Sequence, residues 1–74
     1  MLFVSSEVLL DMAERADSSI EANLSLAGGM LNATHYILCD GDTVFDLGID
    51  DEEIEMPAEA WLHEYKTATW RIDQ

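Results

Sequence analysis

The chain has 74 residues with 16 Asp and Glu against three Lys and Arg, so its net charge is −13. A chain of this length forms one small domain, 1–74, with a small core and low stability. The hydrophobic fraction of 49% and the aromatic residues argue against an intrinsically disordered acidic chain. Three basic residues cannot offset the repulsion of a phosphate backbone, so the composition disfavours direct nucleic-acid binding.

A helical pattern dominates the first third of the chain. Ser5 and Ser6 are suitable N-caps. Apolar residues then recur at helical spacing, and Gly28-Gly29 would end the helix, so the pattern predicts one long amphipathic helix over 6–27. Five acidic residues fall on the face opposite the apolar stripe: Glu7, Asp11, Glu14, Asp17 and Glu21.

The central segment predicts a β-hairpin. His35–Cys39 and Thr43–Phe45 are rich in residues that favour strands. Asp40-Gly41-Asp42 between them is a strong turn signal. A second helix over Asn32–Cys39 that ends at Gly41 is the alternative.

The rest of the chain predicts shorter elements. The acidic segment Ile49–Glu55 is expected to be a loop or a solvent-facing edge strand, and Pro57 suits the first turn of a short helix over Ala58–Lys66. Thr67–Ile72 is expected to be a final strand that pairs with Leu2–Val4. The expected fold is α+β, with one long N-terminal amphipathic helix against a short antiparallel sheet and a second short helix. A small all-α bundle is the alternative.

Ten of the sixteen acidic residues lie between Asp40 and Glu64, a stretch without Lys or Arg. Such a density of oxygen ligands suggests a cation site, but no register starting at Asp40 or Asp46 has the ligands and the glycine of an EF-hand loop. His35, Cys39 and His63 lack the paired ligand spacing of a structural zinc site. We therefore expect no metal and no other cofactor.

No combination of residues indicates catalysis. The negative surroundings of Cys39 disfavour a thiolate nucleophile, and the chain contains no Gly-rich phosphate loop and no nucleophile-elbow motif. We expect that the protein is not an enzyme. Trp61, Tyr65 and Trp70 are candidates for the core or for anchors of an interface.

The sequence favours a cytoplasmic protein without membrane contact. Cys39 is the only cysteine, so an intrachain disulfide is excluded. The N-terminal residues lack the basic region of a signal peptide. No apolar run reaches the ~20 residues of a membrane-spanning helix.

Self-repulsion at this net charge opposes compactness, and a basic partner is the simplest reason to keep it. The short single domain, the lone Cys39, the acidic face from Glu7 to Glu21 and the acidic block from Asp40 to Glu64 resemble small acidic proteins of phages and mobile elements. Those proteins block host defence machinery and include DNA mimics and anti-CRISPR inhibitors. The resemblance implies a stoichiometric inhibitor in the cytoplasm of a host bacterial cell, which occupies a basic nucleic-acid-binding surface of a host defence protein. The carboxylates expected at the contact are Glu7, Asp11, Glu14, Asp17, Glu21, Asp50, Asp51, Glu52, Glu53 and Glu55.

The alternative function is a self-associating adaptor or an antitoxin-like interaction module. In that hypothesis the apolar stripe from Leu9 to Leu31 exceeds what a small core can cover and forms a homodimer interface.

Overall fold

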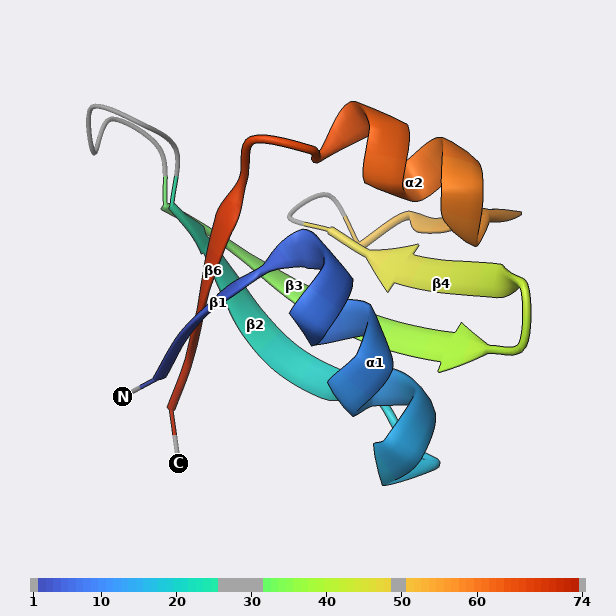
Figure 1. The fold of residues 1–74 in the computed structure, drawn as a ribbon, viewed down its shortest axis with the longest axis horizontal. Coiled ribbons are helices and arrows are strands. Elements are labelled where there is room, and N and C mark those ends of the chain that lie inside the picture. Colours follow the sequence, from blue (N-terminus) through green and yellow to red (C-terminus); the bar gives the residue numbers. More distant parts are fainter. Residues whose placement is uncertain (1, 26–31, 49–50, 74) are drawn as a thin grey trace.

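The computed structural model describes residues 2–25, 32–48 and 51–73. Within them, six strands form one antiparallel sheet, and two short helices cover one of its faces (Figure 1). The strand order is β1-β6-β2-β3-β4-β5, so the last strand lies between the first two. The elements are β1 (Leu2–Ser5), α1 (Ser6–Ala16), β2 (Ile20–Ser25), β3 (Asn32–Asp40), β4 (Thr43–Leu47), β5 (Glu53–Pro57), α2 (Ala58–Glu64) and β6 (Thr69–Ile72).

The long N-terminal helix predicted over 6–27 is wrong, because α1 has only 11 residues. It begins after Ser5, whose hydroxyl accepts a hydrogen bond of 3.4 Å from the backbone N–H of Val8. It ends at Asp17, which adopts the left-handed conformation with φ 52°. A short polar side chain tolerates that conformation better than most residues do.

The segment that follows is strand β2 and not the second half of a helix. Its apolar residues alternate with polar ones, and Ala22 and Leu24 are buried, as expected for a strand with one covered face. Ile20 and Leu24 are four residues apart, a spacing that fits a helix and a strand equally well. The expected fold of one long helix against a short sheet is therefore wrong, and so is the alternative all-α bundle, because the described part of the chain forms a six-stranded sheet with two short helices. The end of the predicted helix, 26–27, lies outside the described residues.

The predicted hairpin is confirmed. β3 and β4 are joined by Gly41 and Asp42, and Gly41 has φ 59°. A two-residue hairpin turn needs such a positive φ, because only then does the turn match the twist of the strands. The alternative second helix over Asn32–Cys39 is therefore wrong.

The remaining predicted elements are also found, with shifted bounds. The acidic segment continues into β5, an edge strand, and α2 follows Pro57 as its N-cap. β6 pairs with β1 from Leu2 opposite Ile72 to Ser5 opposite Thr69. Both ends of the described chain therefore lie at one edge of the sheet (Figure 1).

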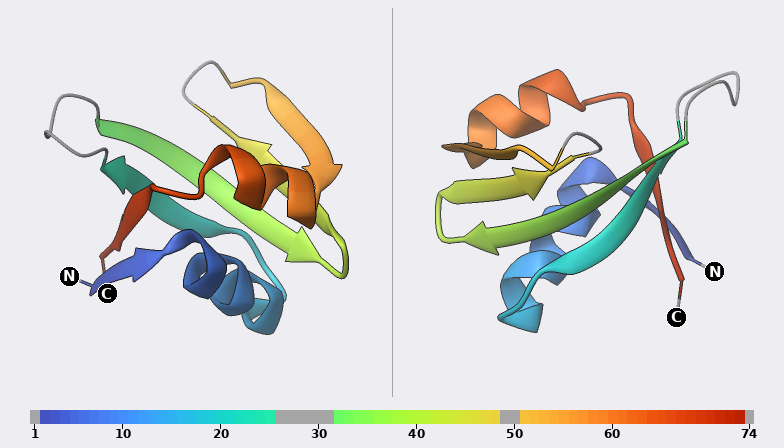
Figure 2. Two further views of the ribbon diagram at one scale, coloured as in Figure 1. Left: turned by 45° about the horizontal axis from the view of Figure 1, so that its top comes forward. Right: turned by 180° about the vertical axis from the view of Figure 1, so that it is seen from behind.

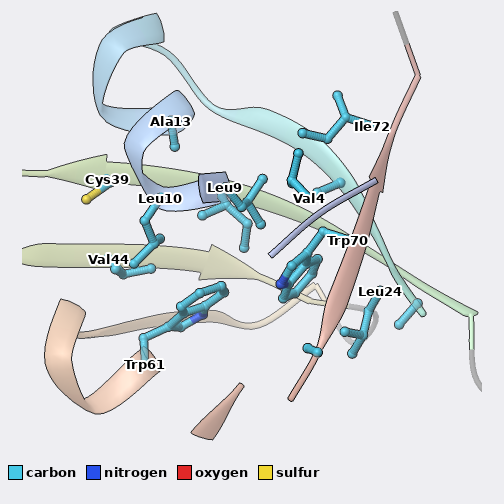
Figure 3. Close-up of a cluster of buried hydrophobic side chains, with 14 residues drawn as sticks. Val4, Leu9, Leu10, Ala13, Leu24, Cys39, Val44, Trp61, Trp70 and Ile72 are labelled. Atoms are coloured by element: carbon cyan, nitrogen blue, oxygen red, sulfur yellow. The ribbon is translucent and has the colours of Figure 1, made fainter. Parts of the chain in front are cut away.

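Both helices pack on the same face of the sheet and share one core. Leu9 and Leu10 of α1 lie among core side chains that include Val44 of β4 and Trp70 of β6 (Figure 3). Trp61 of α2 stacks on Trp70 with ring centroids 5.4 Å apart. Within the described chain, neither helix has the length and the apolar character needed to cross a membrane.

Candidate interaction surface

The sheet has one face that no described element covers. In the view from behind, β2 and β3 lie in front of α1 (Figure 2, right). Side chains alternate between the two faces of a strand. In β3 the buried residues Ala33, His35, Ile37 and Cys39 point toward the helices, and the residues between them point away.

The strand register gives the neighbours on this uncovered face. Glu21 of β2 lies opposite Tyr36 of β3, Tyr36 lies opposite Leu47 of β4, and Leu47 lies opposite Glu53 of β5. These four residues form a row across four adjacent strands, with two apolar side chains in the middle and a carboxylate at each end.

A second row of three side chains lies beside the first row. Leu38 of β3 lies opposite Phe45 of β4, and Phe45 lies opposite Glu55 of β5. The centre of the uncovered face is therefore apolar, and we call these four residues the sheet-face patch: Tyr36, Leu38, Phe45 and Leu47. Together with Ser19 and Glu53 they line a shallow hollow of about 210 Å³.

Carboxylates border the sheet-face patch on two sides and at the hairpin end. Glu21 lies on the β2 side, Glu53 and Glu55 lie on the β5 side, and Asp40 lies beside the turn; all four are exposed. We call these four residues the acidic rim. A described base on this face is Arg71 of β6, which lies outside the rim, in the row of Asn23. An apolar centre with a polar rim is the usual anatomy of a protein–protein interface.

The ten predicted contact residues do not form one surface, because the predicted helix ends early. Glu7, Asp11 and Glu14 are exposed on α1, on the helical side of the domain, where Arg15 pairs with Asp11 at 3.1 Å. Glu21 is on the opposite side of the sheet, together with Glu53 and Glu55. Of the others, Asp17 caps α1, Asp51 and Glu52 precede β5, and Asp50 lies outside the described residues.

A buried polar and aromatic network holds α2 against the sheet. Asp46 of β4 is 2% exposed, and its carboxylate oxygens contact His35 Nδ1 at 2.6 Å and Trp61 Nε1 at 2.9 Å. The indole N–H of Trp61 donates to the carboxylate of Asp46, because an indole nitrogen can only donate. The His35 ring packs edge-on against Trp70 and Tyr65, with centroids 5.3 and 6.2 Å away.

Ser6 extends this network to α1. Its hydroxyl accepts a hydrogen bond of 2.9 Å from Trp70 Nε1 and donates one of 2.7 Å to the Tyr65 carbonyl. Both tryptophans are therefore core residues and not interface anchors, with Trp61 0% exposed. The sequence does not reveal Asp46 as a core residue, because a carboxylate between the apolar residues Phe45 and Leu47 indicates a solvent-facing position in a strand.

The described residues show neither a metal centre nor an activated nucleophile. Nowhere in 2–25, 32–48 and 51–73 do three His, Cys, Asp or Glu side chains converge to hold a metal ion. Burial raises the pKa of the Cys39 thiol, and the charges of Glu14, Asp40 and Asp42 raise it further. The thiolate, which is the reactive form, is therefore disfavoured at neutral pH.

A second concave region lies on the helical side of the domain. A groove of about 600 Å³ is lined by residues of both signs and of both helices: Glu7, Pro57, Glu59, Ala60, Leu62, His63 and Lys66. Because Lys66 and His63 stand beside the carboxylates, this groove lacks the single sign of charge that surrounds the sheet-face patch.

Comparisons with protein-family models, with curated proteins and with solved structures find no match. The sheet-face patch and the acidic rim have the apolar centre and polar border that are usual in protein–protein interfaces.

Proposed function

We propose that this chain is a non-catalytic binding protein with a basic protein partner. The observation that carries the proposal is the charge of −13 on 74 residues. Carboxylates are exposed on both sides of the domain, on α1 and around the sheet-face patch. Such a field steers a basic partner toward the domain and repels nucleic acids and other acidic proteins.

The partner that we propose is a host defence protein with a basic nucleic-acid-binding surface, which the chain occupies as a stoichiometric inhibitor. Surfaces that bind nucleic acid carry clustered Lys and Arg that neutralise phosphates. A domain that presents carboxylates to the same Lys and Arg competes with the nucleic acid without any reaction. The resemblance in charge and size to phage and mobile-element inhibitors supports this class of partner, with the cytoplasm of a bacterial host as the place of action.

The test of this proposal is capture followed by competition. The immobilised chain is exposed to a bacterial lysate at low salt and eluted with a salt gradient. The captured protein is then loaded with its nucleic acid and titrated with free chain. We expect one nucleic-acid-binding protein at moderate salt and loss of its nucleic acid at one equivalent of chain. A captured protein that keeps its nucleic acid would contradict inhibition, and capture of acidic or neutral proteins alone would contradict the basic partner.

A second candidate function is self-association, but not through the stripe from Leu9 to Leu31. Leu9 and Leu24 of that stripe are buried in the core, so its described part, 9–24, offers no dimer interface. The observation that favours self-association is the edge strand β1, where Leu2 and Phe3 are exposed and no residue from 2 to 5 is charged or proline. An uncharged edge offers unpaired backbone groups to a second strand.

A further inference from the structure

The sheet-face patch defines the partner more narrowly than the net charge does. We infer that this face binds an extended segment of another protein in which one apolar side chain is flanked on both sides by Lys or Arg. The inference rests on the proposed function, since it assigns the binding face and the chemistry of the basic partner.

The spacing of the acidic rim sets the spacing of the basic residues. The row of Glu21, Tyr36, Leu47 and Glu53 crosses four strands. Adjacent strands are about 4.8 Å apart, so the backbones of the two glutamates are about 14 Å apart. In an extended chain, residues i and i+4 point the same way and are about 13 Å apart. A segment laid across the strands therefore presents a basic residue to each glutamate, with its central apolar residue over Tyr36 and Leu47.

The apolar centre of the face contributes affinity that does not depend on charge. Tyr36 is 44% exposed and borders the hollow of about 210 Å³ that the sheet-face patch lines. A contiguous apolar patch with polar residues around it is typical of interaction sites. Its burial stabilises the complex at salt concentrations that screen the glutamates, whereas the acidic rim sets the rate of association and its orientation.

The charge of the acidic rim favours a basic segment over a second copy of this chain as the occupant of the face. A face-to-face dimer would bring two sets of Glu21, Glu53 and Glu55 together around the contact. Like charges at an interface disfavour association strongly. Arg71 stands outside the rim, in the row of Asn23, and the carboxylate that the structure places beside its guanidinium is that of Asp73, at 3.9 Å, and not a glutamate of the rim.

The test uses two synthetic peptides and the whole chain labelled for NMR. One peptide has the core lysine-serine-tryptophan-serine-lysine, and in the other serine replaces the tryptophan. At low salt we expect the tryptophan peptide to shift the amide signals of β3 and β4 around Tyr36 and Phe45. We expect it to bind about fivefold more tightly than the serine peptide, as one aromatic contact would allow. The shifts from the serine peptide should spread over all the acidic surfaces.

Two matched variants locate the contact. Tyr36→Thr removes an aromatic side chain from the sheet-face patch. Ile54→Thr removes an apolar side chain of nearly the same exposure, 46%, from the opposite face of β5, in the row of the buried Asp46. Threonine retains strand propensity in both. We expect Tyr36→Thr to abolish the preference for the tryptophan peptide and Ile54→Thr to keep it. Leu47→Thr replaces the first variant if Tyr36→Thr does not fold.

The outcomes separate this inference from the proposed function. Equal binding of the two peptides, shifts centred on α1, or an equal loss in both variants would overturn the assignment of the face while leaving a basic partner in place. Absence of any shift with either peptide at low salt would overturn the basic partner as well.

Discussion

The indole N–H of Trp61 in α2 donates a hydrogen bond of 2.9 Å to the buried carboxylate of Asp46 in β4. Asp46 stands between Phe45 and Leu47, so the strand alternation directs these two side chains to the uncovered face. The contact between Trp61 and Asp46 therefore fixes the strand that carries half of the sheet-face patch. His35, the second partner of Asp46, lies next to Tyr36 in β3 and supports the other half in the same way.

Removal of the buried carboxylate should destabilise the domain strongly. Asp46→Ala leaves His35 Nδ1 and Trp61 Nε1 without the oxygen atoms that they contact, and a buried polar group left without its partner costs about 1–3 kcal/mol. Urea unfolding followed by tryptophan fluorescence measures the loss. Asp46→Asn keeps one carbonyl oxygen as an acceptor and should lose less. A loss below about 1 kcal/mol in Asp46→Ala, the size of one ordinary hydrogen bond, would mean that the network does not hold α2.

The end of α1 offers a stabilising substitution. Asp17 has φ 52° and places a negative charge at the C-terminal end of the helix dipole. Asp17→Gly relieves the strain of the positive φ and removes the unfavourable charge, and we expect the free energy of unfolding to rise by about 0.5–1 kcal/mol. In a domain of this size that gain corresponds to a rise in Tm of a few degrees, about 2–8 °C. The control is Asp11→Gly in the interior of α1, which has the same change in charge but lowers the helix propensity and removes the pair with Arg15, so the stability should fall by up to about 1 kcal/mol. A lower Tm for Asp17→Gly would contradict the assigned helix end.

Alkaline pH should destabilise the fold in two stages. Burial raises the pKa of Cys39, with smaller contributions from Glu14, Asp40 and Asp42, and burial also raises the pKa of Tyr65, helped by Asp46 and Glu64. Between the unfolded and the folded pKa of each group the native state holds more protons, so its stability falls as the pH rises. The decline should begin at about pH 8.5 for the thiol and steepen at about pH 10 for the phenol.

Cys39→Ala separates the two stages. This variant should lose the first decline and keep the second, as measured by urea unfolding from neutral to alkaline pH. A wild-type stability that rises between these pH values would contradict the burial of the thiol.

Salt should affect the two candidate associations in opposite directions. Binding of a basic partner weakens as salt screens the carboxylates. Self-association through β1 should strengthen, because salt also screens the repulsion between two copies of charge −13. Sedimentation at low and high salt measures the mass, with Phe3→Lys as the variant that blocks the edge and Val8→Lys, an exposed apolar residue of α1, as the control. Association that is equal in both variants would exclude β1 as its site.

The sequence predicted the elements whose signals are local. Asp40-Gly41-Asp42 defines a turn whatever surrounds it, and Pro57 marks the start of α2 in the same way. The end of α1 was missed because Ile20 and Leu24 satisfy two periodicities at once. Only residues 21–23 between them, where polar and apolar residues alternate strictly, indicate a strand and not a helix.

The sheet-face patch could not be predicted from the sequence, for a different reason. Residues 35–39 of β3 form an apolar run that indicates a strand buried on both faces. Nothing in that run says that one face is left uncovered, since this depends on both helices packing on the other side. The acidic composition is evident from the sequence, but the register of β2 to β5, and not one helix face, brings Glu21, Glu53 and Glu55 around Tyr36.

The most direct test compares two triple variants with the same change in charge. Glu21→Gln, Glu53→Gln and Glu55→Gln neutralise most of the acidic rim, and Glu7→Gln, Asp11→Asn and Glu14→Gln neutralise the exposed face of α1. The affinity of the tryptophan peptide is measured for each by NMR titration at low salt. Loss of binding in the first triple with retention in the second is the result expected of a partner site on the sheet. An equal loss in both would mean that the peptide responds only to net charge, and a loss in the α1 triple alone would place the site on the helical side of the domain.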